Sequence, residues 1–181
     1  MKKGIILLAD GFEQTEALGP QDILLRAGIK ADLVSTNHTD HIISSMGTKV
    51  FAQYTLEDID FEKYDFIIIP GGSTGVENLS NSNEVASVLK HFYQNQKLIC
   101  AICAGPSLLI KLNLLNNRNF TCFPGFEVGA TTRNKVDPVV VDKNLITARS
   151  MYYSLPFAEE IVRFYLGQDG LDKIKHGTKG I

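Results

Sequence analysis

The 181-residue sequence has little of what marks a disulfide-stabilised, membrane-bound or nucleic-acid-binding protein. Its three cysteines are an odd number, so we expect no disulfide framework and a reducing, cytoplasmic compartment. Its formal net charge is only -2, too small to predict a nucleic-acid partner or an anionic membrane partner. The first apolar run, from Gly4 to Ala9, is too short for a signal peptide or a membrane span. We therefore expect this run to be the first strand.

The sequence also lacks clustered histidines. Its four histidines are isolated, and none has metal-ligand spacing with a cysteine. We therefore expect neither a metal site nor a bound cofactor.

Apolar segments of two kinds alternate along the chain. Short β-branched runs favour strands at residues 4–9, 29–35, 64–69, 98–102 and 119–123, and hairpins within 42–54 and 136–149. Helical patterns cover residues 16–27, 84–95, 106–115 and 154–166, the last starting at a Ser154 cap. This alternation predicts one α/β domain over residues 1–181, with a mostly parallel sheet between helices and a polar tail from about residue 167.

The strongest local signal is at Cys103, where an apolar run ends abruptly. Small residues lie two positions to either side, Ala101 and Gly105, and Pro106 suits the first turn of a helix. A sharp strand-to-helix turn of this kind is typical of a nucleophile elbow, which presents one reactive side chain above the sheet. We expect Cys103 to be that nucleophile.

A glycine pair, Gly71-Gly72, follows another predicted strand. Because the carboxyl ends of parallel strands meet at one edge of a sheet, this pair should lie near Cys103. A Gly-Gly pair is often only a tight turn. Beside an elbow, we favour an oxyanion hole formed by the backbone of Gly71, Gly72 and Ala104.

Glu16 opens the first predicted helix near the same edge. A mostly ionised Cys103 would need a pKa about two units below the usual thiol value, and an ionised Glu16 beside it would oppose this. Near Cys103, Glu16 should therefore hold a proton or accept one from the thiol. From spacing alone, a solvated first-turn glutamate is the slightly better interpretation.

The other cysteines are weaker candidates for chemistry. Cys100 lies inside the predicted strand, where buried structural cysteine is the usual role. The Cys-x-x-Cys spacing does not open a helix here, which disfavours a thioredoxin-type function. Cys122 and Phe123 end another predicted strand and are candidates for the pocket wall.

Taken in order, these motifs resemble the ThiJ/PfpI superfamily, in the branch of the Parkinson-disease-associated protein deglycase. The resemblance covers about residues 4 to 166 and rests on four segments: residues 11–16, 22–28, 69–72 and 101–106. It implies a flavodoxin-like sandwich, usually a homodimer. It also implies that Cys103 is the reactive, oxidation-prone cysteine and Glu16 the glutamate that hydrogen-bonds it, with Gly72 and Ala104 at the oxyanion positions.

Three departures from the family pattern affect the expected chemistry. Phe123 stands where some members carry a histidine, and Ala104 replaces the histidine that follows the cysteine in the peptidase branch. A later Arg-Gly-Pro-Gly-Thr motif is replaced by residues 149–154, which should alter one pocket wall. Peptidase and amidotransferase-like activities are therefore disfavoured.

Two functions remain open. The first is an enzyme acting on small reactive carbonyls or glycated substrates, with a deglycase- or glyoxalase-like reaction through Cys103 and Glu16. The second is a redox sensor or redox-dependent chaperone in which Cys103 is oxidised to sulfenate or sulfinate, which needs no dedicated substrate.

Overall fold

The computed structural model describes residues 1–130 and 132–180. Its strands are β1 (Lys3–Leu8), β2 (Lys30–Ser35), β3 (His41–Ile43), β4 (Lys49–Phe51), β5 (Tyr54–Thr55), β6 (Phe66–Ile69), β7 (Leu98–Ile102), β8 (Val139–Asp142) and β9 (Leu145–Ala148). Its α-helices are α1 (Gln14–Arg26), α2 (Ser73–Ser80), α3 (Asn83–Gln94), α4 (Pro106–Lys111) and α5 (Ser154–Lys179). Short 3₁₀ turns cover Leu56–Asp58 (η1), Phe61–Lys63 (η2) and Met151–Tyr153 (η3). None of the described helices combines the length and apolar character needed to cross a bilayer.

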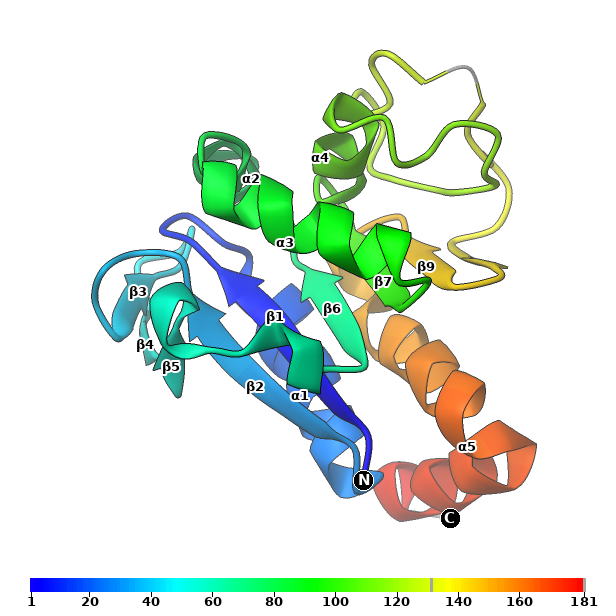
Figure 1. Cartoon of the computed structure of the whole chain (residues 1–181). Helices are drawn as coiled ribbons and strands as arrows, with labels where there is room; N and C mark the ends of the chain where they lie inside the picture. Colours follow the sequence, from blue (N-terminus) through cyan, green and yellow to red (C-terminus); the bar gives the residue numbers. More distant parts are fainter. Residues whose placement is uncertain (131, 181) are drawn as a thin grey trace.

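Seven strands form the main sheet, in the order β5-β2-β1-β6-β7-β9-β8, and only β8 runs antiparallel to its neighbour. The helices lie on both faces of this sheet (Figure 1). The predicted flavodoxin-like three-layer α/β sandwich is therefore confirmed. Because β1 and β6 are neighbours from which the strand order runs in opposite directions, the edge at their carboxyl ends is the usual ligand position in such a sheet.

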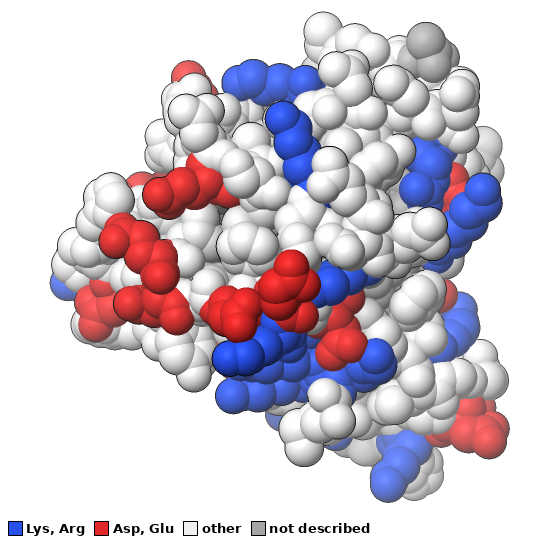
Figure 2. Space-filling view, in the orientation of Figure 1, with Lys and Arg blue, Asp and Glu red and all other residues white. Residues whose placement is uncertain are grey.

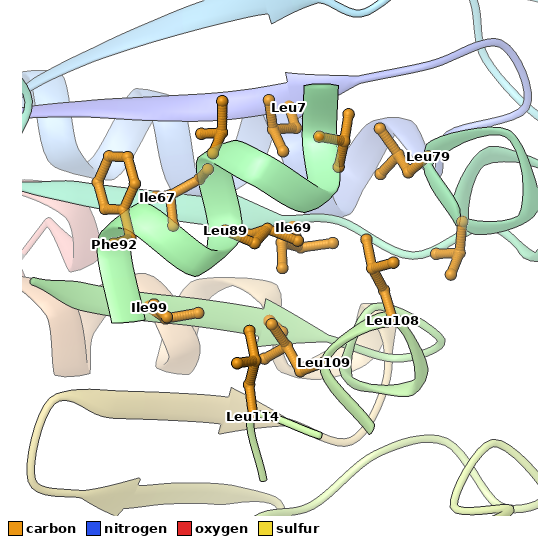
Figure 3. Packing of buried hydrophobic residues seen from close by; sticks show 14 of the residues in the cluster. Leu7, Ile67, Ile69, Leu79, Leu89, Phe92, Ile99, Leu108, Leu109 and Leu114 are labelled. Carbon is orange, nitrogen blue, oxygen red and sulfur yellow. The ribbon is translucent and has the colours of Figure 1, made fainter. Parts of the chain in front are cut away.

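The alternation of side chains along each strand builds two cores. Ile67 and Ile69 of β6 face one side with α2, α3 and α4, whereas Ile68 faces the other side with α1 and α5. Figure 3 shows side chains of β6 and β7 pointing toward Leu89 and Phe92 of α3. Burial on both faces explains why the central strands read as continuous apolar runs.

Charges of both signs lie side by side on the face seen in Figure 2. Ion pairs such as Lys2–Asp65 and Lys3–Asp32 join them. In the same view, acidic side chains gather over the left half of this face and basic side chains lie below them.

One predicted strand, residues 119–123, is wrong. The segment is irregular, although Phe120 and Cys122 are fully buried. The amide of Thr121 donates to the Thr147 hydroxyl at 2.9 Å, and the amide of Phe123 donates to the Cys103 carbonyl at 2.9 Å. The apolar pattern thus reflects burial against the ends of β7 and β9, while β8 occupies the sheet edge.

Helix limits also differ from those predicted. The helix α1 begins at Gln14 rather than at residue 16, and it contains Pro20. The helix α4 ends at Lys111 instead of residue 115, because Asn113 adopts a left-handed φ of 59°. At α5, Tyr153 holds the capping position predicted for Ser154, whose hydroxyl donates to the Met151 carbonyl.

Two other segments refine the predicted order. The hairpin expected within residues 42–54 is confirmed as β3 and β4, which form a separate two-stranded sheet. The two-residue strand β5 was missed, because so short a run has no readable alternation. At the helix α3, Ser82 is the capping residue, and its hydroxyl accepts a hydrogen bond from the Val85 amide.

The polar tail continues as helix beyond a break at Gly167, where φ is 70°. Leu171 in this part is completely buried against the α1 and α5 side of the sheet. Lys175 also pairs with Glu159 across the break, at 2.9 Å. The tail therefore packs onto the fold in spite of its polar composition.

We expect Leu171→Ala to lower the free energy of unfolding by about 2–3 kcal/mol, because it leaves a cavity in this core. Leu155→Ala is the matched control, since Leu155 lies in the same helix but is 52% exposed, and it should change stability by less than about 0.5 kcal/mol. Urea denaturation measures both. Equal small losses would show that the tail contributes nothing to the core.

Candidate active site

Cys103 follows directly after β7, at the sharp turn that the sequence predicts. Its φ of 61° is a left-handed conformation, which costs a non-glycine residue about 1–2 kcal/mol. The turn is held because the Cys103 amide donates to the Ala148 carbonyl at 2.9 Å and the Gly105 amide donates to the Ile102 carbonyl at 2.8 Å. A side chain at Gly105 would come within 2.5 Å of the Ile69 carbonyl oxygen, so this position requires glycine. Strain of this kind often accompanies a functional residue.

Glu16 lies beneath this turn, on the first turn of α1, and is 0% exposed. Its Oε2 accepts a hydrogen bond of 2.6 Å from the Gly71 amide. A Cβ at Gly71 would meet this carboxyl oxygen and, at 2.8 Å, the Cβ of Cys103. The two side chains therefore converge on the Gly71 backbone, and a solvated Glu16 is the wrong interpretation.

The start of α1, which carries Glu16, is fixed from two sides. The Gly71 carbonyl accepts from the Glu13 amide at 3.0 Å, while the Glu13 carboxylate accepts from the Glu16 amide at 2.7 Å. Glu13 is thus the capping residue of α1. This arrangement sets the position of Glu16 relative to the strand end at Gly71.

The two neighbouring groups change each other's ionisation. Burial raises the pKa of Glu16 to about 7, against the lowering effect of the Gly71 hydrogen bond. Burial, and then the charge and hydrogen bonding of Glu16, raise the pKa of Cys103 to about 12, although the Ala104 amide opposes this. Near neutral pH the pair therefore holds at least one proton, and Glu16 is close to half protonated. With its pKa raised to about 12, the Cys103 thiol is mostly protonated near neutral pH, in contrast to a freely ionised thiolate.

Gly71 is one of the three predicted oxyanion residues, but its amide already donates a hydrogen bond to the Glu16 carboxyl. Gly72, with a φ of 87°, and Ala104 both line the cavity above Cys103. Gly72 and Ala104 are thus the two of these residues that line the cavity.

The cavity above Cys103 measures about 520 Å³ and opens to solvent. Phe123 lines it, as the sequence predicts, whereas Cys122 is buried behind the wall. Burial raises the pKa of Cys122 to about 11, with Arg133 and Glu127 close by. The full lining is Glu13, Glu16, Ser45, Met46, Gly72, Ser73, Cys103, Ala104, Phe123, Phe126, Ser150, Met151 and Tyr152.

Several of these residues come from segments that sequence reasoning did not connect with the site. Met46 reaches it because the hairpin is tied to the loop after β1: the Ser45 amide donates to the Phe12 carbonyl and the Gly11 amide to the Ile43 carbonyl, both at 2.8 Å. Phe126 was also missed, and only its closeness to Phe123 in the chain hints at its role. The altered wall at residues 150–152 was expected.

Some sequence candidates lie away from the cavity. Cys100 is buried in the core on the α1 and α5 side. Histidine is absent from the cavity lining within the described part of the chain. Over the same residues, no cluster of three or more His, Cys, Asp or Glu side chains is arranged to hold a metal ion.

The protein is thus a flavodoxin-like sandwich with a cysteine at the strand-to-helix elbow and a buried glutamate against it. The chain belongs to the DJ-1/PfpI family, whose model matches residues 2–164. It is 31% identical over 179 residues to the Parkinson disease protein 7 homolog of Danio rerio, covering 96% of this chain and 95% of that protein. It is 33% identical over 174 residues to Protein DJ-1 homolog B of Arabidopsis thaliana, covering 94% of this chain but only 40% of that longer protein.

Solved structures agree closely with the fold. Oxidized Toxoplasma gondii DJ-1 superposes with a TM-score of 0.93 at 28% identity, and Drosophila melanogaster DJ-1beta with a TM-score of 0.93 at 27% identity. Each similarity covers 98% of both chains. The family and the fold are therefore established together.

Proposed function

We propose that this protein is a glyoxalase-type enzyme that converts small 2-oxoaldehydes, or their early protein adducts, into 2-hydroxy acids. The observation that carries the proposal is the Glu16 carboxyl held between the Gly71 amide and Cys103 at the floor of the cavity. Its pKa of about 7 suits a group that both gives and takes protons near neutral pH.

The proposed reaction begins with attack of the Cys103 sulfur on the aldehyde carbon. The thiol proton passes to the aldehyde oxygen through Glu16, which gives a hemithioacetal. The developing negative oxygen lies at the Gly72 and Ala104 backbone, where amide donors stabilise it.

Glu16 then removes the proton from the former aldehyde carbon and returns a proton to the neighbouring carbon, while the hemithioacetal hydroxyl gives up its proton and the neighbouring carbonyl oxygen gains one. The first carbon becomes a thioester and the second carries a hydroxyl group, so the oxidation and the reduction balance within the substrate. Water hydrolyses the thioester to release the hydroxy acid and restore the thiol. No outside oxidant or cofactor is needed.

The reaction is tested by feeding methylglyoxal to the protein in D₂O. We expect lactate with deuterium on the carbon that bears the hydroxyl, because the Glu16 proton exchanges with solvent. Protein blocked at Cys103 with iodoacetamide is the control and should form no lactate. Equal lactate from blocked and unblocked protein would refute the proposal, and lactate without deuterium would remove Glu16 as the proton carrier.

Redox sensing is the second candidate, because only Cys103 of the three cysteines is accessible; Cys100 and Cys122 are buried. That the Toxoplasma gondii relative was solved oxidized also favours it. Protonated Glu16 and the nearby amides would stabilise a sulfinate at Cys103.

Mild peroxide should then add oxygen to Cys103 before the other two cysteines, measured by peptide mass spectrometry. Oxidation of all three at similar rates would count against a sensor. Oxidation at Cys103 without methylglyoxal turnover would make the sensor the better function.

We further propose that the protein acts in a reducing compartment such as the cytoplasm, and as a homodimer. Three free cysteines support the first, and the family membership supports the second.

A further inference from the structure

The walls of the cavity above Cys103 include three aromatic side chains and two methionines, together with three serines. Phe123 and Phe126 meet edge to face, with ring centroids 6.4 Å apart, and Phe123 remains 44% exposed toward the opening. Met46, Met151 and Tyr152 complete these walls. A volume of about 520 Å³ is far more than the methyl group of methylglyoxal requires. The space favours a bulky apolar substituent on the aldehyde.

The charged residues of the cavity lining are both acidic. They are Glu13 and Glu16, and the lining contains no lysine or arginine within the described residues. The charge of Glu13 also raises the pKa of both Glu16 and Cys103, so its field reaches the reacting atoms.

Two arginines near the walls are turned to other partners. The Arg149 guanidinium donates to the Lys135 carbonyl at 3.0 Å and to the Val136 carbonyl at 2.8 Å. Arg133 pairs with Glu127 at 3.1 Å. The Arg133 charge is therefore paired with a carboxylate, and the Arg149 guanidinium is held by backbone carbonyls.

We propose that the cavity selects uncharged 2-oxoaldehydes that carry an aromatic or branched alkyl group, and that Glu13 excludes anionic carbonyl compounds such as 2-oxo acids. The choice of a carbonyl substrate rests on the proposed function, whereas the preference for neutral aromatic molecules rests on the walls and on Glu13. Rejection of the anion comes from like charge in a partly desolvated site.

A protection assay measures this preference without any turnover. Iodoacetamide alkylates Cys103, and intact mass follows the rate while unreactive molecules compete for the cavity. Acetophenone should give half-protection at a concentration at least about tenfold lower than acetone does, from burial of its ring. Benzoate has the same ring with a negative charge, and we expect it to protect no better than acetone.

Two substitutions assign the effect to named residues. Phe123→Ala should weaken protection by acetophenone about tenfold. Tyr93→Ala is the matched control, because Tyr93 is a 42% exposed aromatic residue of α3 outside this cavity, and it should behave as wild type. Glu13→Gln keeps an oxygen that can cap α1, and it should improve protection by benzoate several-fold more than protection by acetophenone.

Turnover completes the test. The kcat/KM for phenylglyoxal should exceed that for methylglyoxal at least about tenfold, and Phe123→Ala should reduce this ratio. Absence of turnover with the expected protection pattern would refute the glyoxalase function and still support the ligand preference. Equal protection by acetophenone, acetone and benzoate, or turnover without preference for phenylglyoxal, would overturn the preference itself.

Discussion

Replacing Glu16 with glutamine should slow methylglyoxal turnover by about 10²–10⁴-fold and, at the same time, speed alkylation of Cys103 by iodoacetamide. Turnover falls because glutamine cannot carry a proton, and general acid–base catalysis typically contributes that much. The glutamine oxygen can still accept the Gly71 hydrogen bond, so the site keeps its shape.

Alkylation speeds up because the thiolate is the reacting form. Burial and the Glu16 carboxylate together hold the pKa of Cys103 at about 12 in the native protein. Glutamine removes the charge but not the burial, so the pKa of Cys103 should fall while staying above the usual thiol value. Each unit of that fall raises the thiolate fraction at pH 8 about tenfold.

The measurement pairs steady-state kinetics with alkylation rates between pH 6 and 10. Glu77→Gln, on the exposed side of α2, is the control for removing a charge and should match wild type in both assays. Cys103→Ser gives the baseline without a nucleophile. If Glu16→Gln lowered turnover and alkylation together, Glu16 would act by promoting the thiolate rather than by moving a proton.

Stability should depend on pH through the same carboxyl. The folded pKa of Glu16, about 7, lies above its unfolded value of 4.5, so the native state binds more protons between these two pH values. The contribution of Glu16 to the free energy of unfolding is therefore fully present below about pH 4.5. It falls by on the order of 3 kcal/mol as the pH rises toward 7. Glu16→Gln should lack this component when urea denaturation is compared across that range.

The second large effect is expected from Gly72→Ala, which should lower the free energy of unfolding by about 4 kcal/mol. Gly72 has a φ of 87°, and a Cβ there would come within 2.8 Å of the Glu13 amide nitrogen and 3.0 Å of the Phe12 carbonyl carbon. The Gly11 carbonyl oxygen would lie closer still. Backbone strain and overpacking each cost about 1–3 kcal/mol, and backbone atoms cannot rotate away.

Gly125→Ala separates the two causes. Gly125 has a similar φ of 95°, but nothing lies within 4 Å of the position of its Cβ. Gly125→Ala should therefore lower the free energy of unfolding only by the cost of backbone strain, about 1–2 kcal/mol. Gly72→Ala should also impair turnover, because the loop before α1 must move away from the new Cβ and this displaces Glu16 at the start of α1. If urea denaturation gave equal losses of unfolding free energy for the two variants, the neighbouring loop would have to move away from the new Cβ at Gly72 with no loss of stability.

Local sequence patterns predicted the structure best where the backbone conformation at a position admits only one type of residue. Gly105 and Pro106 around Cys103 predicted the elbow, and its left-handed φ is what such a turn requires. The pattern at residues 119–123 predicted a strand wrongly, because several types of backbone suit such a pattern. Its middle residues, 120–122, are buried, yet burial alone does not separate a strand from an irregular segment packed across strand ends.

The cavity could be predicted only in part. Phe123 was correctly predicted to line the cavity, because it ends a segment that was expected at the same sheet edge as Cys103. Met46 and Phe126 were missed, since a hairpin and a long loop bring them there through hydrogen bonds to other segments. Spacing along the chain contains no information about such contacts.

The amino-acid sequence by itself determined the α/β alternation and the cysteine at the elbow, because each depends on neighbouring residues. Spacing alone favoured a solvated Glu16 and the family resemblance implied a contact with Cys103, but only the tertiary structure gives the burial and the partners of the Glu16 carboxyl. The Gly71 amide holds the Glu16 carboxyl against Cys103 across the sheet edge, and burial there raises the pKa of both groups. Desolvation depends on everything packed around a group, so it exists only once the chain has folded.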